Sequence, residues 1–194
     1  MATSLLGSAA KRVLIVTFPF PPMIGSSGVQ RPLSLVRHLP EHGWQPIVLS
    51  AHPRAYESTD DGQLRDIPAG VPVHRPFALD IARPFGTRSR YPIWLALPDR
   101  WASWAISGWW TGLKLIRQYR PQLIWSTYPI ASAHLIAARL QRSTGLPWIA
   151  DFRDPMVEDD YPANLLQRAS HERIERRAAQ HAATCVFVTE GTRR

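Results

Sequence analysis

The sequence predicts an α/β protein built as a doubly wound, mostly parallel sheet of the Rossmann-like kind. Short apolar runs without polar alternation recur along the chain, as expected for strands that are buried on both faces. Segments with helical periodicity stand between most of them. The predicted strands are 13–17, 46–50, 71–74, 123–127, 148–150 and 184–188. We expect one domain over residues 13–194, preceded by a flexible tail at 1–12.

The first predicted helix covers residues 29–41. Its apolar stripe is Leu33, Val36 and Leu39. Proline is tolerated in the first turn of a helix, where Pro32 stands, and Gly43 is a fitting C-terminal stop.

A second helix is expected over residues 100–119, with Asp99 as its N-cap. Its small and apolar positions repeat at helical spacing and should face the core. They are Trp101, Trp104, Ala105, Gly108, Gly112, Leu115, Ile116 and Tyr119. Further helices are expected over 130–142 and 165–181, and in the last of these Glu172 and Arg176 have the spacing of an i,i+4 ion pair.

The chain is basic, with a formal net charge of +8 and a pI near 10.5. This charge favours a partner that bears phosphate groups or an anionic membrane surface. A single cysteine excludes an internal disulfide and is typical of a reducing compartment. We therefore expect a cytoplasmic protein, and a peripheral position on the inner face of the plasma membrane is the variant that the basic charge favours. No window contains the roughly 18 uninterrupted apolar residues of a spanning helix.

Charged residues follow the strand at 148–150. Asp151, Arg153 and Asp154 arrive together where the apolar run stops. Buried charge is costly unless it is paired or used, and ligands bind at the carboxyl ends of parallel strands. We therefore predict that 151–154 forms the polar floor of a cleft; the alternative is an Asp–Arg pair that only closes the loop.

A glycine-containing loop follows the first strand and includes Gly25, Ser26, Ser27 and Gly28. Backbone N–H groups in such a turn can approach a phosphate. The spacing is not that of a dinucleotide fingerprint, and no acidic residue ends the second strand. The loop is thus a candidate phosphate or substrate contact, or a turn that needs glycine for its geometry.

A third group follows the strand at 123–127. Ser126, Thr127 and Tyr128 should lie on the same rim as Asp151, and His134 should lie in the first turn of the next helix. The positive helix end disfavours a protonated ring there, so a neutral imidazole able to accept a proton is expected. A structural histidine is the alternative.

Five of the eight tryptophans lie between residues 91 and 120, where basic residues are also frequent. The tryptophans on the helical stripe are expected in the core or at a domain interface. The other tryptophans, with the nearby arginines, predict contact with an anionic membrane surface. Stacking on nucleic acid is an alternative. Because the sequence contains no nucleic-acid motif, no nucleic-acid partner is expected. The tryptophans are Trp94, Trp101, Trp104, Trp109 and Trp110, and the basic residues are Arg83, Arg88, Arg90, Arg100, Lys114, Arg117 and Arg120.

Several motifs together give the chain a resemblance to a known family. They are Val-Leu-Ile-Val-Thr at 13–17 with the loop to Gly-Val-Gln-Arg at 28–31, Leu-Pro-Asp-Arg-Trp at 97–101, Pro-Gln-Leu-Ile-Trp-Ser-Thr-Tyr-Pro at 121–129, Ala-His-Leu-Ile-Ala at 133–137, Pro-Trp-Ile-Ala-Asp-Phe-Arg-Asp-Pro at 147–155, Glu-Arg-Arg at 175–177 and Val-Thr-Glu at 188–190. Because these motifs occur in this order and spacing, the chain resembles the N-terminal, acceptor-side domain of GT-B-fold glycosyltransferases of the family 4-like group.

The resemblance implies a division of labour. Two Rossmann-like domains would face each other across a cleft, with acceptor binding in this half and most of the nucleotide-sugar site in a C-terminal domain beyond residue 194. Gly25 to Gly28 would border the donor phosphates. Ser126, Thr127, Tyr128, Asp151, Arg153 and Asp154 would lie on the acceptor side, and His134 would be the catalytic candidate.

The same resemblance implies a retaining transfer of a sugar from a nucleotide-sugar donor to a lipid-linked or polysaccharide acceptor in envelope or capsule glycan synthesis. No metal and no cofactor besides the donor substrate is implied. The histidine that many members carry directly after the fourth strand is replaced here by Tyr128-Pro129. The chain alone is expected to be inactive, and the alternative is a membrane-surface or ligand-binding module without catalysis.

Overall fold

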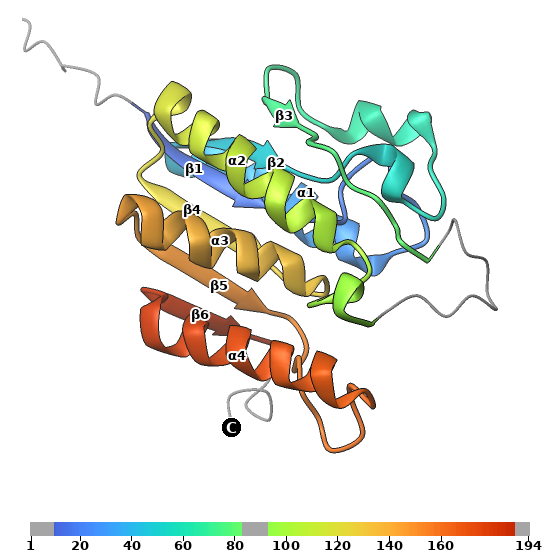
Figure 1. Cartoon of the computed structure of the whole chain (residues 1–194). Coiled ribbons are helices and arrows are strands. Elements are labelled where there is room, and N and C mark those ends of the chain that lie inside the picture. Colours follow the sequence, from blue (N-terminus) through green and yellow to red (C-terminus); the bar gives the residue numbers. More distant parts are fainter. Residues whose placement is uncertain (1–9, 83–92, 189–194) are drawn as a thin grey trace, which may run out of the picture.

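The computed structural model describes residues 10–82 and 93–188, which form a parallel six-stranded sheet between two layers of helices (Figure 1). The strands lie in the order β3-β2-β1-β4-β5-β6. They are β1 (Lys11–Val16), β2 (Trp44–Leu49), β3 (Val73–His74), β4 (Leu123–Thr127), β5 (Trp148–Phe152) and β6 (Thr184–Phe187). The predicted fold class is thereby confirmed.

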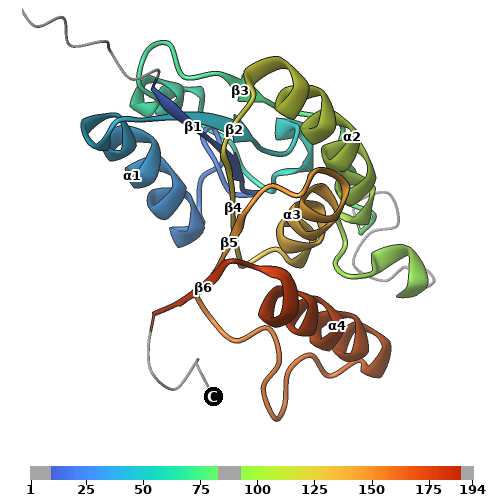
Figure 2. The ribbon, with the colours of Figure 1, turned by 90° about the vertical axis from the view of Figure 1, so that its left-hand side faces the viewer.

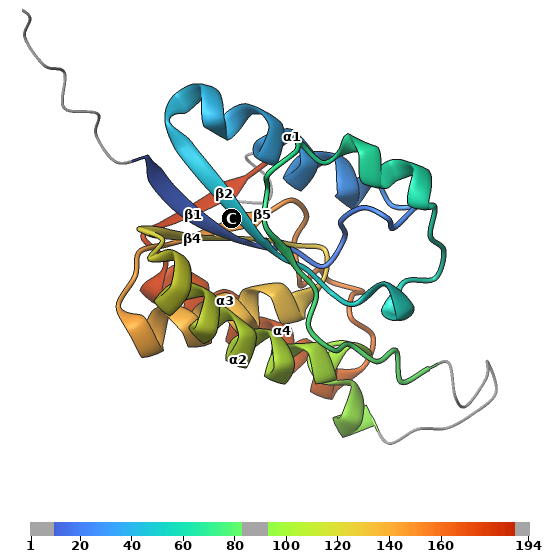
Figure 3. The ribbon, with the colours of Figure 1, turned by 90° about the horizontal axis from the view of Figure 1, so that it is seen from above.

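Four α-helices connect these strands. They are α1 (Gln30–His38), α2 (Ala102–Tyr119), α3 (Ala131–Thr144) and α4 (Leu165–His181). Helices α2, α3 and α4 cover one face of the sheet, and α1 lies on the other (Figures 2 and 3). This arrangement follows from right-handed crossovers, which place helices on opposite faces once the chain reverses its direction across the sheet. Here the reversal separates β1 from β4.

The strands are buried because both faces of the sheet are covered in its centre. Ile15 of β1 lies opposite Val48 of β2 on one side and Trp125 of β4 on the other. One apolar cluster fills the space between the sheet and the layer of α2, α3 and α4, and a second lies under α1. The uninterrupted apolar runs in the sequence reflect this double burial.

The helix stripe predicted for residues 100–119 faces the core as expected. Trp104, Ala105 and Leu115 are buried. Gly108 and Gly112 let α2 approach α3 closely, since a Cβ atom at either position would lie 2.6 Å from the side chain of Ile136 or Leu140.

Three local predictions need correction. Lys11 and Arg12 begin β1 instead of ending a tail, because they pair with the start of β2. The ion pair on α4 joins Arg168 to Glu172 over 3.4 Å, one turn before the predicted Glu172–Arg176 pair. The third concerns Asp99, which was predicted to cap only α2 and accepts hydrogen bonds at the starts of both α2 and α3.

Asp99 connects two helices. One carboxylate oxygen accepts a hydrogen bond from the backbone N–H of Trp101, just before α2 begins at Ala102. The carboxylate also accepts bonds from the backbone N–H and the hydroxyl of Ser132, in the first turn of α3. Because free N–H groups at a helix start need an acceptor, Asp99 caps α3 from a distant part of the chain.

Candidate functional site at the carboxyl edge of the sheet

The loops that follow β1, β4 and β5 meet at the carboxyl edge of the sheet, because these three strands are neighbours. β1 pairs with β4, and β4 pairs with β5. The glycine loop, the Tyr128 segment and the segment at 151–154 therefore share one edge, as the sequence predicted. This is the edge where ligands bind in open α/β sheets.

An ion pair joins α1 to β5 at this edge. Both carboxylate oxygens of Asp151 accept hydrogen bonds from Arg31, at 2.6 Å from Nε and 2.7 Å from Nη2. Asp151 is fully buried, whereas the Arg31 side chain is 38% exposed. A bidentate pair of this kind fixes orientation as well as charge, so the start of α1 is held against the end of β5.

Arg31 is a site residue that the sequence did not predict, although it belongs to the motif at 28–31. The signal that could have found it is its place in the first turn of a helix, beside a strand that ends in an aspartate. Asp151, in turn, is not a free carboxylate lining a cleft, since Arg31 occupies both of its oxygens.

The glycine loop is built for close approach. Gly25 has a φ of +79°, the left-handed region that favours glycine. Ser26 accepts a hydrogen bond from the N–H of Gly28 over 3.1 Å. A Cβ atom at Gly28 would lie 2.9 Å from Pro19 and 3.3 Å from Nη1 of Arg153. Glycine at this position thus lets the guanidinium of Arg153 reach the loop.

Arg153 is the available cation of this loop. Among residues 10–82 and 93–188 it makes no hydrogen bond or ion pair, in contrast to Arg31. It lines the mouth of a groove of about 950 Å³ together with Ser27 and Arg31. The floor of this groove is the apolar sheet face beside α1, which includes Leu123, Trp125, Ile149 and Val186.

Ser126 and His134 lie inside the protein. The Ser126 hydroxyl lies 2.8 Å from Nδ1 of His134 and accepts a hydrogen bond from the indole N–H of Trp148 over 2.7 Å. The other ring nitrogen of His134 is buried without a partner among the described residues. His134 also packs on Phe152, with ring centroids 4.6 Å apart.

Burial lowers the pKa of His134 to about 3, so the ring is neutral. Neutrality was predicted from the helix start, but the cause is the apolar surroundings. Because Ser126 and His134 have no exposed surface, neither reaches a substrate in this structure. Thr127 is likewise internal, with its hydroxyl bonded to the carbonyl of Tyr128. The expected acceptor-side role of Ser126 and Thr127 and the catalytic role of His134 therefore find no support in the geometry.

Tyr128 does reach a cavity. A hollow of about 210 Å³ lies between the start of α3, the start of α4 and the segment before α2. Its walls are mainly aromatic and hydrogen-bonding side chains, namely Asp99, Arg100, Trp101, Tyr128, Tyr161, Gln167 and His171. Burial, and then the neighbouring Tyr161, raise the pKa of Tyr128, so its hydroxyl stays protonated. Asp154 is exposed nearby and raises the same pKa.

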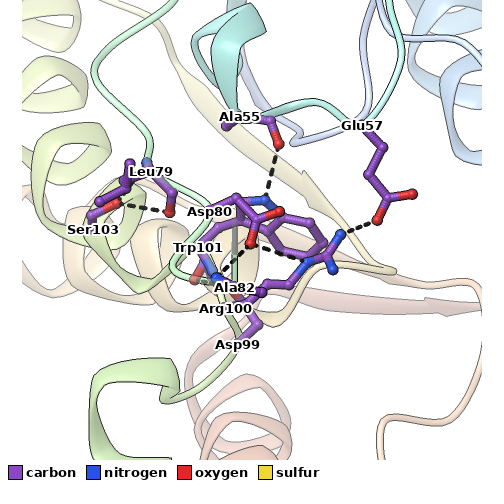
Figure 4. Close-up of polar contacts among 10 residues, drawn as sticks. Ala55, Glu57, Leu79, Asp80, Ala82, Asp99, Arg100, Trp101 and Ser103 are labelled. Atoms are coloured by element: carbon purple, nitrogen blue, oxygen red, sulfur yellow. Dashed lines mark hydrogen bonds and ion pairs between the residues drawn. The ribbon is translucent and has the colours of Figure 1, made fainter. Parts of the chain in front are cut away.

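One wall of this hollow is locked by Arg100 and Trp101 (Figure 4). The guanidinium of Arg100 lies 4.3 Å from the Trp101 ring and forms ion pairs with Glu57 and Asp80. The indole N–H of Trp101 donates to the carbonyl of Ala55 over 3.1 Å. The wall is therefore rigid, and it joins the loop after β2 to the start of α2.

His171 forms the base of the hollow. Its two ring nitrogens face carbonyl oxygens, that of Met156 at 3.1 Å and that of Pro98 at 3.0 Å. His171, Tyr161 and Gln167 were not predictable as site residues, because all three lie on or before a charged helix without a motif. In the described part of the chain, no three His, Cys, Asp or Glu side chains converge as metal ligands would.

The tryptophan-rich segment divides between core and surface. Trp104 is fully buried, and Trp101 and Trp109 pack against the core. Trp94 and Trp110 are 66% and 56% exposed. Residues 91 and 92, with Arg83, Arg88 and Arg90, lie outside the described residues. None of the described helices is long and apolar enough to cross a membrane.

The family model described as "Glycosyl transferase 4-like domain" matches residues 28–194 of this chain. No curated protein sequence matches the chain significantly.

Solved structures share the fold. The calicheamicin glycosyltransferase CalG4 aligns with a TM-score of 0.53 and 12% identity, over 90% of this chain and 43% of its own. SsfS6, a glycosyltransferase of Streptomyces sp. SF2575, gives 0.51 and 13%, over 92% and 50%. The spinosyn rhamnosyltransferase SpnG, complexed with thymidine diphosphate, gives 0.50 and 16%, over 91% and 44%. The chain thus spans half or less of the length of these three structures.

Proposed function

Because the chain belongs to the glycosyl transferase 4-like family, we propose that it is the acceptor-binding half of a retaining glycosyltransferase. The complete enzyme would transfer a sugar from a nucleotide-sugar donor to a lipid-linked or polysaccharide acceptor in envelope or capsule glycan synthesis. The observation that carries the proposal is the glycine loop, which Arg153 approaches at the carboxyl edge of the sheet.

The loop supports contact with the donor phosphates. A departing nucleoside diphosphate develops negative charge, which positioned cations and backbone N–H groups stabilise. Arg153 supplies a guanidinium that is unpaired among the described residues, and Arg31 holds the start of α1 against the end of β5 through Asp151. The proposal therefore moves Arg153 from the acceptor side, where the resemblance places it, to the donor side, whereas Asp151 acts by holding Arg31.

The hollow at Tyr128 supports contact with the acceptor. Aromatic side chains stack on the apolar faces of a sugar ring, and its hydroxyls are bound by groups that donate and accept hydrogen bonds. Tyr128, Tyr161 and Gln167 provide such groups around about 210 Å³. Asp154 stands at the exposed side of the same region, where a hydroxyl of the acceptor would approach.

Calorimetric titration of the 194-residue chain with uridine diphosphate and thymidine diphosphate tests the donor side. We expect weak binding that Arg153→Gln reduces about tenfold, since one charge-assisted contact is lost. Arg173→Gln, an equal charge change on the exposed side of α4, is the control and should leave the affinity unchanged. Absence of binding by both diphosphates, or equal affinity for the Arg153→Gln variant, would contradict the proposal.

Activity of the chain alone gives a second test. Since it spans half or less of the matched structures, we expect little or no sugar transfer from nucleotide-sugar donors by the purified chain. Robust turnover would refute the view that a second half supplies most of the donor site.

A membrane-surface role is the second candidate, and the exposed face of α2 favours it. Ile106 and Trp110 are 60% and 56% exposed on this face. Phe77 and Leu79 lie beside them, because Ser107 donates to the carbonyl of Phe77 and Ser103 bonds to the backbone of Leu79. Exposed apolar groups gathered in this way mark contact with another surface.

Flotation with anionic vesicles tests this candidate. Trp110→Ser should lower the vesicle-bound fraction several-fold, because the indole would be the main apolar group to enter the interface. Leu165→Ser removes a side chain that is 79% exposed on α4 and is the matched control. Equal flotation of the Trp110→Ser variant would count against α2 as the contact.

A further inference from the structure

A third cavity lies far from the candidate site, between the C-terminal halves of α3 and α4. It has a volume of about 620 Å³ and is lined by Ala138, Arg139, Gln141, Arg142, Gly145, Arg177 and His181. Gly145 ends α3 just before β5 begins, so this cavity lies at the amino edge of the sheet (Figure 1). The glycine loop and Tyr128 lie at the opposite, carboxyl edge.

The cavity gathers positive charge. Among the residues that the structure describes, its lining includes three arginines and one histidine but no acidic side chain. Helices α2 and α3 contain no Asp or Glu at all. The two acids of α4 are engaged elsewhere, since Glu172 pairs with Arg168 and Glu175 accepts from the N–H of Met156.

The guanidinium groups of this cavity influence each other. Burial, and then the positive charge of Arg177, lower the pKa of Arg139. Among the described residues, Arg142 and Arg177 make no ion pair or hydrogen bond, and Arg139 has only a long contact of 3.5 Å to the carbonyl of Ala105. Two cations held near each other in a partly buried site repel unless an anion lies between them.

Helix ends explain only part of the arrangement. The partial negative charge at a helix C-terminus favours basic residues in the last turn, which accounts for Arg142 on α3 and His181 on α4. Arg139 and Arg177 lie about one turn earlier. The helix ends therefore do not account for the convergence of these two arginines from different helices.

We propose that the cavity between α3 and α4 binds a phosphoryl group, held by Arg139, Arg142 and Arg177. Guanidinium groups match phosphate oxygens in charge and in geometry. The volume falls in the range of about 300–1,000 Å³ that is usual for small-molecule sites, so the ligand can be larger than a lone phosphate. The phosphoryl group can belong to a soluble phosphorylated molecule or to a lipid headgroup.

The probe is pyrophosphate, and the starting protein is the Arg153→Gln variant. This substitution weakens the separate phosphate contact that is proposed at the glycine loop. In calorimetric titration at constant ionic strength, this protein should still bind pyrophosphate. Adding Arg142→Gln and Arg177→Gln, both exposed enough to be replaced without disturbing the core, should weaken binding by at least tenfold.

Arg173→Gln with Arg176→Gln is the matched control. It removes the same charge from exposed positions of α4 that do not line the cavity, and it should change the affinity by less than about twofold. Equal thermal unfolding of both double variants checks that the fold is intact. If the two double variants weaken pyrophosphate binding equally, the binding reflects only general charge attraction and the proposal is overturned. Absence of binding to both pyrophosphate and phosphatidic acid vesicles would also overturn it.

Vesicles of phosphatidylcholine with and without phosphatidic acid distinguish the source of the phosphoryl group. Loss of flotation on phosphatidic acid vesicles in the Arg142→Gln, Arg177→Gln variant, but not in its control, would support a lipid headgroup. Loss of pyrophosphate binding alone would support a soluble ligand. The outcome is independent of the proposed transferase function, because neither probe is a sugar donor and the compared substitutions lie far from the carboxyl edge of the sheet.

Discussion

The ion pair between Arg31 and Asp151 leads to the sharpest prediction, because its two partners differ in burial. Asp151 has no exposed surface, whereas the Arg31 side chain is 38% exposed. Removing the arginine leaves a carboxylate buried without a partner. Removing the carboxylate leaves an arginine that can turn toward water. The two substitutions should therefore have unequal costs, although they break the same pair.

The magnitudes follow from the two environments. Arg31→Leu should destabilise the fold by about 3–5 kcal/mol, the cost of leaving a buried charge unpaired. Asp151→Asn should cost about 1–2 kcal/mol, since the amide oxygen still accepts one hydrogen bond and Arg31 regains water. For a chain of this size, 1 kcal/mol corresponds to about 2–4 °C in Tm, so the arginine variant should melt at least 6 °C lower.

Urea unfolding followed by circular dichroism measures both single variants and the double variant. In the double variant the buried charge is gone, so its loss of stability should be smaller than the sum of the single losses by about 1.5 kcal/mol or more. Arg37→Leu, which removes a surface ion pair with Asp66, is the control and should cost less than about 1 kcal/mol. Equal losses for Arg31→Leu and Asp151→Asn, or additive losses, would refute the reasoning.

Three further predictions concern other parts of the fold. Gly28→Ala should lower the free energy of unfolding by about 1–3 kcal/mol and weaken nucleoside diphosphate binding, because the added Cβ would lie 2.9 Å from Pro19; calorimetry and urea unfolding measure both. Folding lowers the pKa of His134 to about 3. The stabilisation linked to its neutral ring should therefore be complete above about pH 6.5. As the pH falls from there toward 3, the free energy of unfolding should decline by up to about 1.4 kcal/mol per pH unit. His134→Leu should flatten that part of the stability profile, and an unchanged slope would contradict the assignment. Asp99→Ala should cost about 1–2 kcal/mol through loss of the cap on Ser132, and unfolding at neutral pH tests this.

The strands and helices were predictable because their signals are local. A strand buried on both faces must be apolar throughout, and a helix such as α2 must repeat its small and apolar residues at helical spacing. Long-range polar contacts left no such signal. The sequence predicts Asp99 as the cap of the helix that follows it, whereas Asp99 also caps α3, which begins about thirty residues later.

The sequence predicts where the candidate site lies, but it does not predict which of its side chains pair with one another. The sequence showed that charge follows β5, and the parallel sheet brings that charge next to the glycine loop. It did not show which charges are paired. Arg31 comes from the opposite end of the chain from Asp151, and the enclosure of His134 depends on Phe152 and Trp148 packing around it.

The alternation of side chains along β5 explains why the predicted polar floor divides in two. Successive residues of a strand point to opposite faces of the sheet. Asp151 bonds to Arg31 of α1 on one face, and Arg153, two residues on, reaches the glycine loop on the same side. Phe152 points to the other face, where it packs on His134 of α3.

The carboxyl edge therefore has two chemically different sides, and the proposed function assigns them to different substrates. The α1 side offers a glycine loop and the Arg153 guanidinium, which has no partner in the described part of the chain, and both suit an anion. The side of α3 and α4 offers the protonated hydroxyl of Tyr128 and aromatic faces, which suit a neutral glycan. Since β5 separates them, a change such as Arg153→Gln on the anionic side should leave the hollow at Tyr128 intact, and binding of a diphosphate and of an acceptor analogue should respond to different substitutions.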